Sequence, residues 1–296
     1  MSYEIKQTFA SPLYGNLVLE AGTNRLLAGV GHNAHRAWTF PLNTPRGLNV
    51  IQEYSFDHPF HNGIFVGQGN VRQGERMANF WAPAFDWRQA ANPAFQHLGQ
   101  LKYGEPPRMA VQADGVVFTY NTVWNDEVGQ PMLNEARTIR ISSTEDATVC
   151  DVTSAKTAAY GPVGFGNTKF GTIGARVQPQ LLPVLGGQII GAKDGELRRG
   201  TADEVASAKA CDAVAYENEL PALGRFGLCL MIRDNTASTN RQGPWFIRDY
   251  GMAMFNATMT ESISLAEGAT WITTLRVAAY DGALTWERVQ AWGREI

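Results

Sequence analysis

The sequence predicts an all-β protein: a single antiparallel β-sandwich domain over residues 1–296, with one or two short helices. Three observations lead to this prediction. Several segments alternate apolar and polar residues with a period of two, turn-forming residues separate these segments at short intervals, and few segments show a helical period. Thirty Gly and fourteen Pro residues, spread along the chain, also suit many strands joined by turns.

The strand pattern is clearest in three segments, residues 115–124 (GVVFTYNTVW), 226–234 (FGLCLMIRD) and 270–280 (TWITTLRVAAY). One face of each segment is apolar, as in a half-buried antiparallel strand. We expect the following residues to point into the core: Val116, Phe118, Tyr120 and Trp124; Phe226, Leu228, Leu230 and Ile232; Leu275, Val277 and Ala279. Turn residues punctuate the chain at 113–115, 125–131, 193–196, 266–268 and 280–282.

Two segments have helical character. Residues 201–210 open with Thr201 and Glu204 at the spacing of a capping box, which predicts a short helix. Residues 285–296 place Trp286, Val289 and Gly293 along one stripe, which predicts a terminal helix. The remaining chain has no fixed-period repeat and no linker-like run, so two packed antiparallel sheets are the simplest architecture.

Composition excludes several classes of protein. The net charge is −3 and the basic residues are scattered, so no nucleic-acid interface is expected. No run of 18 apolar residues predicts a membrane span, and the N-terminal segment lacks the apolar centre of a signal peptide. The widely spaced Cys150, Cys211 and Cys229 read as buried, reduced thiols. We therefore expect a cytoplasmic protein.

Motifs of common enzyme classes are missing from the sequence. It contains neither a G-x-x-x-x-G-K-[ST] loop nor a G-x-S-x-G elbow. The glycine-rich stretch GFGNTKFG (164–171) does not sit between a strand and a helix, so a dinucleotide fingerprint is unsupported. Most NTPases, common dehydrogenases and α/β-hydrolases are excluded in this way.

The stretch DHPFH (57–61) holds the densest cluster of titratable groups. A carboxylate beside an imidazole fixes its tautomer and raises its basicity, so Asp57, His58 and His61 are candidates for an acid–base site. Pro59 restricts His58 to an extended backbone, and Gly63 permits a sharp turn. Two other interpretations stay open: a turn whose polar groups satisfy each other, or a metal site, for which a third ligand is not evident.

Other candidates lie along the rest of the chain. The stretch 32–47 brings His32, His35 and Arg36 together, and Arg36 could pair with a ligand carboxylate, with Asp57 or with Glu53. Flat aromatic faces can stack on sugar rings, and the tryptophans considered are Trp38, Trp81, Trp87, Trp124 and Trp245. Each of these tryptophans could equally be a core residue.

Three further segments carry polar candidates. Glu135 and Arg137 lie two apart on one strand face, either as a buried ion pair or as an acid oriented by an arginine. Lys169 could bind an anion or be a surface charge. Residues 243–256 contain Arg248 and Tyr250, and the tyrosine could be a hydrogen-bonding acid or a core aromatic.

Taken in order, five of these segments resemble an uncharacterised bacterial family labelled "methane oxygenase PmoA". They are DHPFHNGIF (57–65), ANFW (78–81), NEART (134–138), GNTKFGTIGARV (166–177) and GPWFIRDYG (243–251). The resemblance runs from about residue 30 to 282. It implies a soluble β-sandwich, often encoded near sugar oxidoreductases and sugar isomerase-like proteins, and therefore a role in carbohydrate metabolism. Methane chemistry is not expected, because the catalytic membrane oxygenase of that name needs transmembrane helices.

The chain departs from the family pattern at several charged positions. The family motif resembles D-H-P-H-H-R-G, where this chain has Phe60 and Asn62. Where the family tends to have D-T-K-E-G, this chain has Asn167 and Phe170. Either the substrate differs or part of the family's site is altered.

The first functional hypothesis is a carbohydrate-active enzyme of lyase, isomerase or hydrolase type. A galactose-mutarotase-like or jelly-roll-like sandwich would offer a concave face where residues of several strands converge. A histidine would transfer a proton beside a carbonyl of an oxidised (keto) sugar or a glycoside. The candidate catalytic residues are His58, His61, Glu135, Lys169 and Tyr250, and the candidate substrate-binding residues are Arg36, Asp57, Trp81, Asn167 and Arg248.

Two alternatives remain: a non-catalytic sugar-binding or accessory protein, and a metal-dependent lyase that uses His58 and His61. The sequence assigns no residue as a metal ligand and leaves the cofactor undetermined; a divalent metal is compatible with it but not required. The expected partner is a small-molecule sugar, with no nucleic acid and no membrane. A homo-oligomer is also compatible with the sequence.

Overall fold

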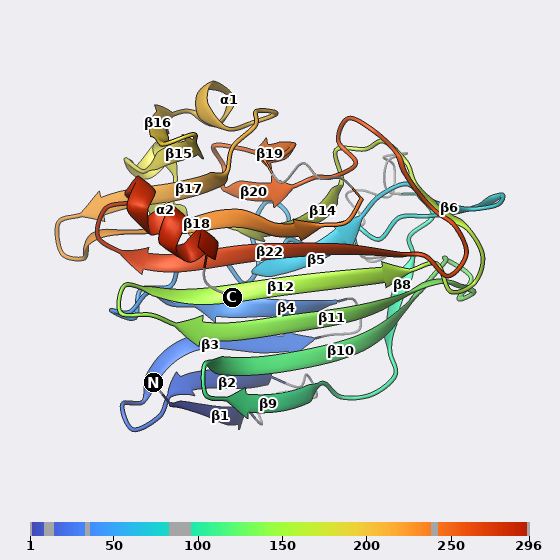
Figure 1. The fold of residues 1–296 in the computed structure, drawn as a ribbon, viewed down its shortest axis with the longest axis horizontal. Helices are drawn as coiled ribbons and strands as arrows, with labels where there is room; N and C mark the ends of the chain where they lie inside the picture. The colour runs from blue at the N-terminus through green and yellow to red at the C-terminus, as the bar shows by residue number, and fades with distance from the viewer. Residues whose placement is uncertain (1, 9–14, 33–35, 83–95, 238–241, 295–296) are drawn as a thin grey trace.

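The chain folds into two large antiparallel β-sheets packed face to face, which confirms the predicted all-β sandwich (Figure 1). The computed structural model describes residues 2–8, 15–32, 36–82, 96–237 and 242–294. Figure 1 looks onto the larger sheet, with β3, β4 and β5 of the other sheet behind it. The strands and helices named below are those of the described residues.

The first sheet has eight strands in the order β1-β2-β3-β4-β5-β14-β20-β19. Its strands are β1 (Tyr3–Thr8), β2 (Gly15–Glu20), β3 (Arg25–His32), β4 (Ala37–Leu42), β5 (Ile64–Gln68), β14 (Gly171–Arg176), β20 (Met252–Phe255) and β19 (Trp245–Ile247). Each pair of neighbours is antiparallel.

The second sheet has ten strands in the order β16-β15-β17-β18-β22-β12-β11-β10-β8, and β9 pairs with β10 beside β8. They are β16 (Glu196–Gly200), β15 (Gln188–Lys193), β17 (Ala213–Leu220), β18 (Gly224–Asn235), β22 (Thr270–Asp281), β12 (Ala147–Thr157), β11 (Pro131–Ser143), β10 (Gly115–Asn125), β8 (Gln100–Tyr103) and β9 (Arg108–Gln112).

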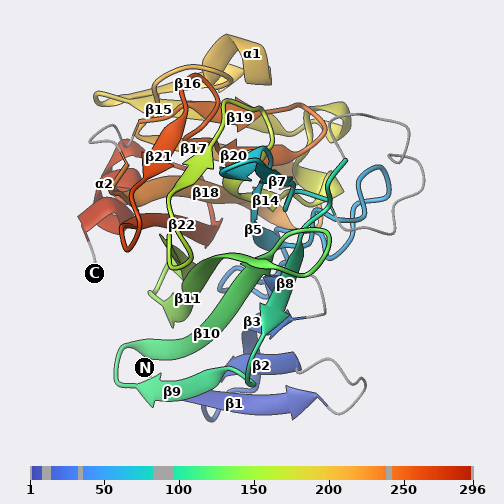
Figure 2. The same ribbon diagram turned by 90° about the vertical axis from the view of Figure 1, so that its right-hand side faces the viewer.

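A small third sheet, in the order β21-β13-β6-β7, lies at one end of the sandwich, the end that faces the viewer in Figure 2. Its strands are β21 (Ile263–Leu265), β13 (Val163–Phe165), β6 (Val71–Gln73) and β7 (Arg76–Ala78). The helical segments are α1 (Ala202–Val205), α2 (Trp286–Arg294) and the 3-10 turns η2 (Pro179–Leu181) and η3 (Pro183–Leu185). Among the described residues, no helix has the length and apolar character needed to span a membrane.

The main core lies between the two large sheets and is built from alternate residues of each strand. The expected inward faces are confirmed, because all of their residues are buried and belong to this core: Val116, Phe118, Tyr120 and Trp124; Phe226, Leu228, Leu230 and Ile232; Leu275, Val277 and Ala279. The three cysteines are buried and unpaired, also as expected.

A helix is present in both predicted segments, although α1 covers only Ala202–Val205 of the predicted residues 201–210. In α1 the Glu204 carboxylate accepts a hydrogen bond from the Thr201 backbone N–H at 2.8 Å, as a capping box requires. Helix α2 lies on the outer face of the ten-stranded sheet, where Val289 and Trp292 pack over Met231 and Tyr280 (Figure 1). Because α2 covers the central strands, they are apolar on both faces, as in the segment FGLCLMIRD.

The outer face of the eight-stranded sheet carries a second apolar layer, here called the outer apolar cluster. It consists of Phe60, Phe65, Trp81, Ala82, Met252 and Met254, with Leu98, Phe170 and Phe246 packed against it. Strand alternation explains it, because Ile64 and Val66 of β5 enter the main core while Phe65 points outward. The loop that bears DHPFH packs here, so this face positions the histidines.

Charged side chains are buried between the two large sheets. Both oxygens of the Glu135 carboxylate accept from the Arg137 guanidinium, at 2.9 and 2.8 Å. Trp124 Nε1 and Ser154 Oγ also donate to this carboxylate, at 2.8 and 2.6 Å, and Lys156 Nζ donates to Ser154 Oγ at 2.9 Å. We call these five residues the core charge network. Its acceptors and donors are well matched, which is the condition under which buried ions are tolerated.

The network contains one carboxylate against two cations. Burial alone would raise the pKa of Glu135, but the charges of Arg137 and Lys156 outweigh burial and lower it. Burial also lowers the pKa of Lys156 to about 8, although Glu135 opposes that shift. Arg137 Nη1 donates to the Ala37 carbonyl of β4 at 3.1 Å, so the network ties the ten-stranded sheet to the eight-stranded sheet.

Replacing Glu135 by glutamine should destabilise the protein strongly, because Arg137 and Lys156 would remain buried without a counter-charge. We expect E135Q to lower the free energy of unfolding by about 3–5 kcal/mol, measured by urea denaturation. The matched control is E219Q, whose partner Arg225 lies on the surface, and its cost should be no more than about 1 kcal/mol. Equal costs for the two variants would contradict the structural role of the network.

Candidate functional site

The DHPFH segment forms a braced turn on the outer face of the eight-stranded sheet. The His61 backbone N–H donates to the His58 carbonyl at 2.9 Å, and Ser55 Oγ donates to the same carbonyl at 2.6 Å. Asn62 Nδ2 donates to the Glu53 carbonyl at 3.2 Å. Gly63 then has a φ of +50°, and a Cβ there would lie 1.9 Å from the Thr39 carbonyl oxygen, so only glycine fits. The His61 N–H and the His58 and Glu53 carbonyls are thus satisfied without the imidazoles.

Asp57 joins His58 to an arginine from a distant strand. Asp57 Oδ2 lies 2.8 Å from His58 Nδ1, and Asp57 Oδ1 accepts from Arg176 Nη2 at 2.5 Å. Burial alone would raise the pKa of the Asp57 carboxyl, but the hydrogen bonds from Arg176 and His58 outweigh burial and hold this pKa below its usual range. An ionised carboxylate can only accept a hydrogen bond, so Nδ1 of His58 carries the proton. In the neutral ring, Nε2 then has the free lone pair.

Four rings stack in parallel across the site, in the order Tyr250, His58, His61, Phe65. Successive centroids lie 5.9, 4.9 and 5.4 Å apart, and successive planes differ by 9°, 4° and 5°. The edges of Phe60 and Trp81 contact the His61 ring, with centroid distances of 4.6 and 5.2 Å. This packing fixes both imidazole planes.

The two histidines of the stack have different environments. The His58 side chain is 37 % exposed, whereas His61 is 2 % exposed and neither of its ring nitrogens has a hydrogen-bonding partner among the described residues. Two causes lower the pKa of His61 well below its ordinary value: burial has the larger effect, and the positive charges of nearby residues add to it. His61 is therefore neutral at neutral pH, and His58 is the imidazole that a substrate can reach.

Arg176 is the residue that sequence reasoning missed. It ends β14, its side chain is 4 % exposed, and its guanidinium lies 4.8 Å from the centroid of the Tyr250 ring. Arg176 belongs to the segment GTIGARV. A single arginine at the end of an otherwise apolar strand could have indicated a buried, paired charge, and this was the signal in the sequence. Tyr250 itself is 40 % exposed, and burial of its inner side raises the pKa of its hydroxyl despite the opposing charge of Arg176.

Arg36 acts as a brace within this region. It is buried, and its guanidinium donates to the Phe60 carbonyl at 3.1 Å and to the Trp81 carbonyl at 2.7 Å. Burial lowers its pKa to about 10, so it remains charged at neutral pH. Arg36 therefore holds the histidine turn against the segment that contains Trp81, and Trp81 is itself buried at 3 % exposure.

The structure does not bring every candidate residue to His58. Glu135 lies in the core charge network between the sheets, and the described residues show no contact between it and either histidine. The exposed Lys169 has its Nζ 5.3 Å from the centroid of the Phe170 ring, beyond Trp81 in the outer apolar cluster. The residues that do meet are Asp57, His58, His61 and Tyr250, together with Arg176.

Arg248 points away from the histidines toward α1. Its Nη1 donates to Ser207 Oγ at 2.9 Å and lies 3.6 Å from Asp203 Oδ1, and its guanidinium stacks 4.1 Å from the centroid of the Phe246 ring. Arg248 is therefore close to Tyr250 in sequence, but its side chain does not join the group around His58.

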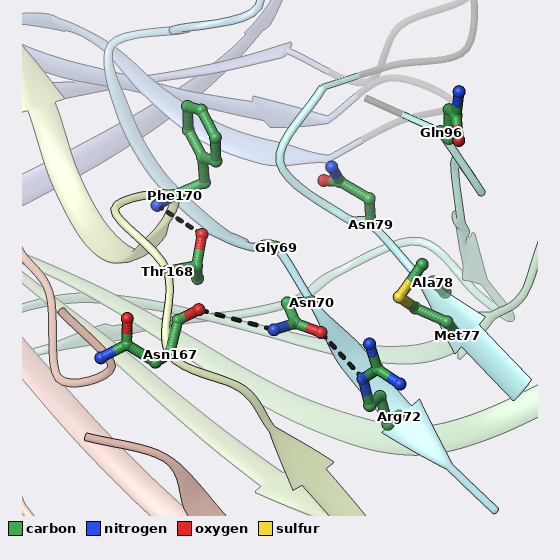
Figure 3. Close-up of a pocket in the computed structure, with 10 residues that line it drawn as sticks. All are labelled: Gly69, Asn70, Arg72, Met77, Ala78, Asn79, Gln96, Asn167, Thr168 and Phe170. Carbon is green, nitrogen blue, oxygen red and sulfur yellow. Dashed lines mark hydrogen bonds between the residues drawn. The ribbon is translucent and has the colours of Figure 1, made fainter. Parts of the chain in front are cut away.

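Asn167 lines a separate pocket of about 260 Å³, here called the rim pocket (Figure 3). This pocket lies between the β6–β7 hairpin and residues 166–170. Its polar lining includes Asn70, Arg72, Asn79, Gln96 and Asn167, and Phe170 supplies an apolar wall. Phe170, one of the departures from the family pattern, therefore separates the rim pocket from Trp81, whose ring centroid is 5.9 Å away.

Chelation of one metal ion by His58 and His61 does not fit the stack. The lone pairs of imidazole nitrogens lie in the ring plane, and two parallel rings direct them along separate planes. Within the described part of the chain, no group of three or more His, Cys, Asp or Glu side chains is arranged to hold a metal ion. Two residues considered from sequence, His35 and Trp87, lie outside the described residues.

The fold and site define a β-sandwich protein with an arginine-supported Asp–His pair on the outer face of one sheet. The chain belongs to DUF6807, a family of unknown function, whose model matches residues 28–293. The expectation of an uncharacterised family is confirmed, and no activity comes with the match. No curated protein matches the chain significantly.

Burial of a neutral His61 predicts a particular dependence of stability on pH. An unfolded histidine gains a proton as pH falls through about 6.5, while the folded protein does not, so stability should fall with pH by up to about 1.4 kcal/mol per unit. The variant H61F lacks this contribution, so its urea-denaturation free energy should fall less steeply between pH 6.5 and 5 than that of the wild type.

The matched control for this experiment is H97F, which removes an imidazole from an exposed position. An identical pH dependence in the wild type and H61F would contradict the assignment of His61 as a buried neutral ring.

Proposed function

We propose that the protein is an enzyme that transfers a proton to or from a small carbohydrate, with His58 as the acid–base residue. The observation that carries the proposal is the contact of the part-exposed His58 with Asp57, at 2.8 Å, while Asp57 is held in turn by Arg176. A base oriented by a carboxylate, which is itself oriented by a third group, is the usual construction of an acid–base site.

The proposed step uses the free lone pair of His58 Nε2. A C–H bond beside a carbonyl of the sugar breaks, its proton moves to Nε2, and its electron pair forms the enolate. The Asp57 carboxylate stabilises the resulting imidazolium through Nδ1–H. Return of the proton from Nε2 to the opposite face of the same carbon gives epimerisation. Its return to the former carbonyl carbon, with the neighbouring hydroxyl proton passing to the former carbonyl oxygen, gives aldose–ketose isomerisation. Expulsion of a β-oxygen substituent, which takes the proton from Nε2 as it leaves, gives elimination.

Two groups near His58 could stabilise the enolate oxygen. Tyr250 keeps its hydroxyl proton, since its pKa is raised, and can donate it in a hydrogen bond. The Arg176 guanidinium adds positive charge beside the same ring. The other two candidate cations, Lys169 and Arg248, lie away from His58 and have no part in this step.

Exposed aromatic rings support a carbohydrate as substrate. Tyr54 is 51 % exposed and Phe56 is 97 % exposed, and both precede His58 in the same loop. Together with Tyr250 they offer flat apolar faces of the kind on which sugar rings stack. The resemblance to proteins encoded near sugar-metabolising enzymes points the same way, and we place the proposed reaction in cytoplasmic carbohydrate metabolism.

Proton abstraction can be tested before the complete reaction is known. Protein in D₂O is incubated with a panel of aldoses, ketoses and keto-glycosides, and ¹H NMR follows replacement of the C–H proton beside the carbonyl by deuterium. Loss of the base in H58Q should slow the exchange by about 100-fold or more. The matched control H97Q, whose imidazole also pairs with a carboxylate, Glu127 at 2.9 Å, should exchange at the wild-type rate.

An unchanged exchange rate in H58Q would rule out His58 as the base. The alternative function is sugar binding without catalysis, and the observation that favours it is the separation of Glu135 and Lys169 from His58. Sugar binding by the wild type with no exchange for any member of the panel would support this alternative.

A further inference from the structure

We propose that the rim pocket binds a sugar acid, with Arg72 pairing with the carboxylate and amide side chains meeting the hydroxyl groups. This site is distinct from the His58 site and does not rest on the proposed reaction. The outer apolar cluster lies between the two, because Trp81 contacts His61 on one side and Phe170 on the other.

The walls of the rim pocket are held by backbone hydrogen bonds. The Gly69 N–H donates to the Phe170 carbonyl at 2.6 Å, and the Gly166 N–H donates to the Asn70 carbonyl at 2.8 Å. A Cβ at Gly69 would lie 3.2 Å from Phe170, so glycine lets the end of β5 approach the 166–170 loop closely. Backbone contacts of the fold therefore fix the walls of the pocket.

The charge of the pocket favours an anion. None of the described residues that line it carries a carboxylate, and Arg72 lies on its wall (Figure 3). Arg72 Nε donates to Asn70 Oδ1 at 3.1 Å, which orients the guanidinium, and Arg72 forms no ion pair with any carboxylate of the described residues. Its two Nη groups can then meet a planar carboxylate in the paired geometry that arginine favours.

The remaining lining suits a hydroxylated ligand. Amide side chains both donate and accept hydrogen bonds, as sugar hydroxyls do, and Asn70 and Asn167 lie on one wall with Asn79 across from them (Figure 3). Asn167 Nδ2 donates to the Met259 carbonyl at 3.2 Å, and the Asn167 backbone carbonyl accepts from Asn70 Nδ2 at 3.5 Å, so hydrogen bonds hold this wall in place (Figure 3). Phe170 supplies an apolar wall beside these amides, and sugar rings also have an apolar side.

The proposal is tested by isothermal titration calorimetry with glucuronate, glucose and glucose 6-phosphate. Wild-type protein should bind glucuronate more tightly than glucose. Loss of the charge in R72Q should weaken glucuronate binding by about tenfold or more. The variant N70D keeps the hydrogen bond from Arg72 and sets a carboxylate beside the guanidinium, although it loses the hydrogen bond that Asn70 Nδ2 donates to the Asn167 carbonyl. Because the charge of Arg72 is then neutralised, glucuronate binding should weaken similarly. The matched control R108Q removes an exposed arginine of β9 and should bind like the wild type.

Four results would overturn the proposal, and the last of them involves the H58Q variant. The first is that glucuronate does not bind the wild type at concentrations up to about 10 mM, because weaker binding would not be specific recognition. The second is unchanged glucuronate binding in both R72Q and N70D. The third is tighter binding of glucose 6-phosphate with the same dependence on Arg72, which would assign the anion as a phosphate. Glucuronate binding that persists in H58Q would support the rim pocket, and binding lost in H58Q but kept in R72Q would place the ligand at the His58 site instead.

Discussion

The contact from Arg137 to the Ala37 carbonyl joins the two sheets at the level of the site, and the arrangement of the histidine turn depends on it. Arg137 is held by both oxygens of Glu135, so its third guanidinium nitrogen is aimed at β4. Arg36, the residue immediately before Ala37, donates to the Phe60 and Trp81 carbonyls on the outer face. Two buried arginines therefore connect the interior of the sandwich to the turn that bears His58.

This frame explains why the two histidines of DHPFH differ. Arg36 holds the turn down, so His61 is pressed between Phe65 and His58 and loses its contact with water. His58 is the next ring of the stack, on the side of Tyr250. Its side chain is partly exposed, and it pairs with Asp57. Burial removes the charge from one imidazole, and hydrogen bonding orients the other. Of these two residues, three apart in sequence, one is a packed support and the other is the accessible imidazole that we propose as the base.

Much of the fold could be predicted from the sequence because it follows from local patterns. Alternation identified the inward faces of β10, β18 and β22, and the Thr201–Glu204 spacing identified α1. The pattern also placed Glu135 and Arg137 on one strand face, but it could not tell whether that face meets water or the opposite sheet. Arg176 could not be assigned to Asp57 at all, since 119 positions separate them and only the pairing of β5 with β14 brings them together. Local periodicity carries no information on such contacts.

The protonation of the His58 ring tests the central claim most directly, and ¹⁵N NMR of the imidazole nitrogens measures it. With the ring neutral, the Asp57 contact predicts a proton on Nδ1 and a bare Nε2 in the wild type, and a loss of that preference in D57N. A wild-type ring protonated on Nε2 instead would leave no lone pair facing the substrate, and would contradict the assignment of His58 as an Asp57-oriented base.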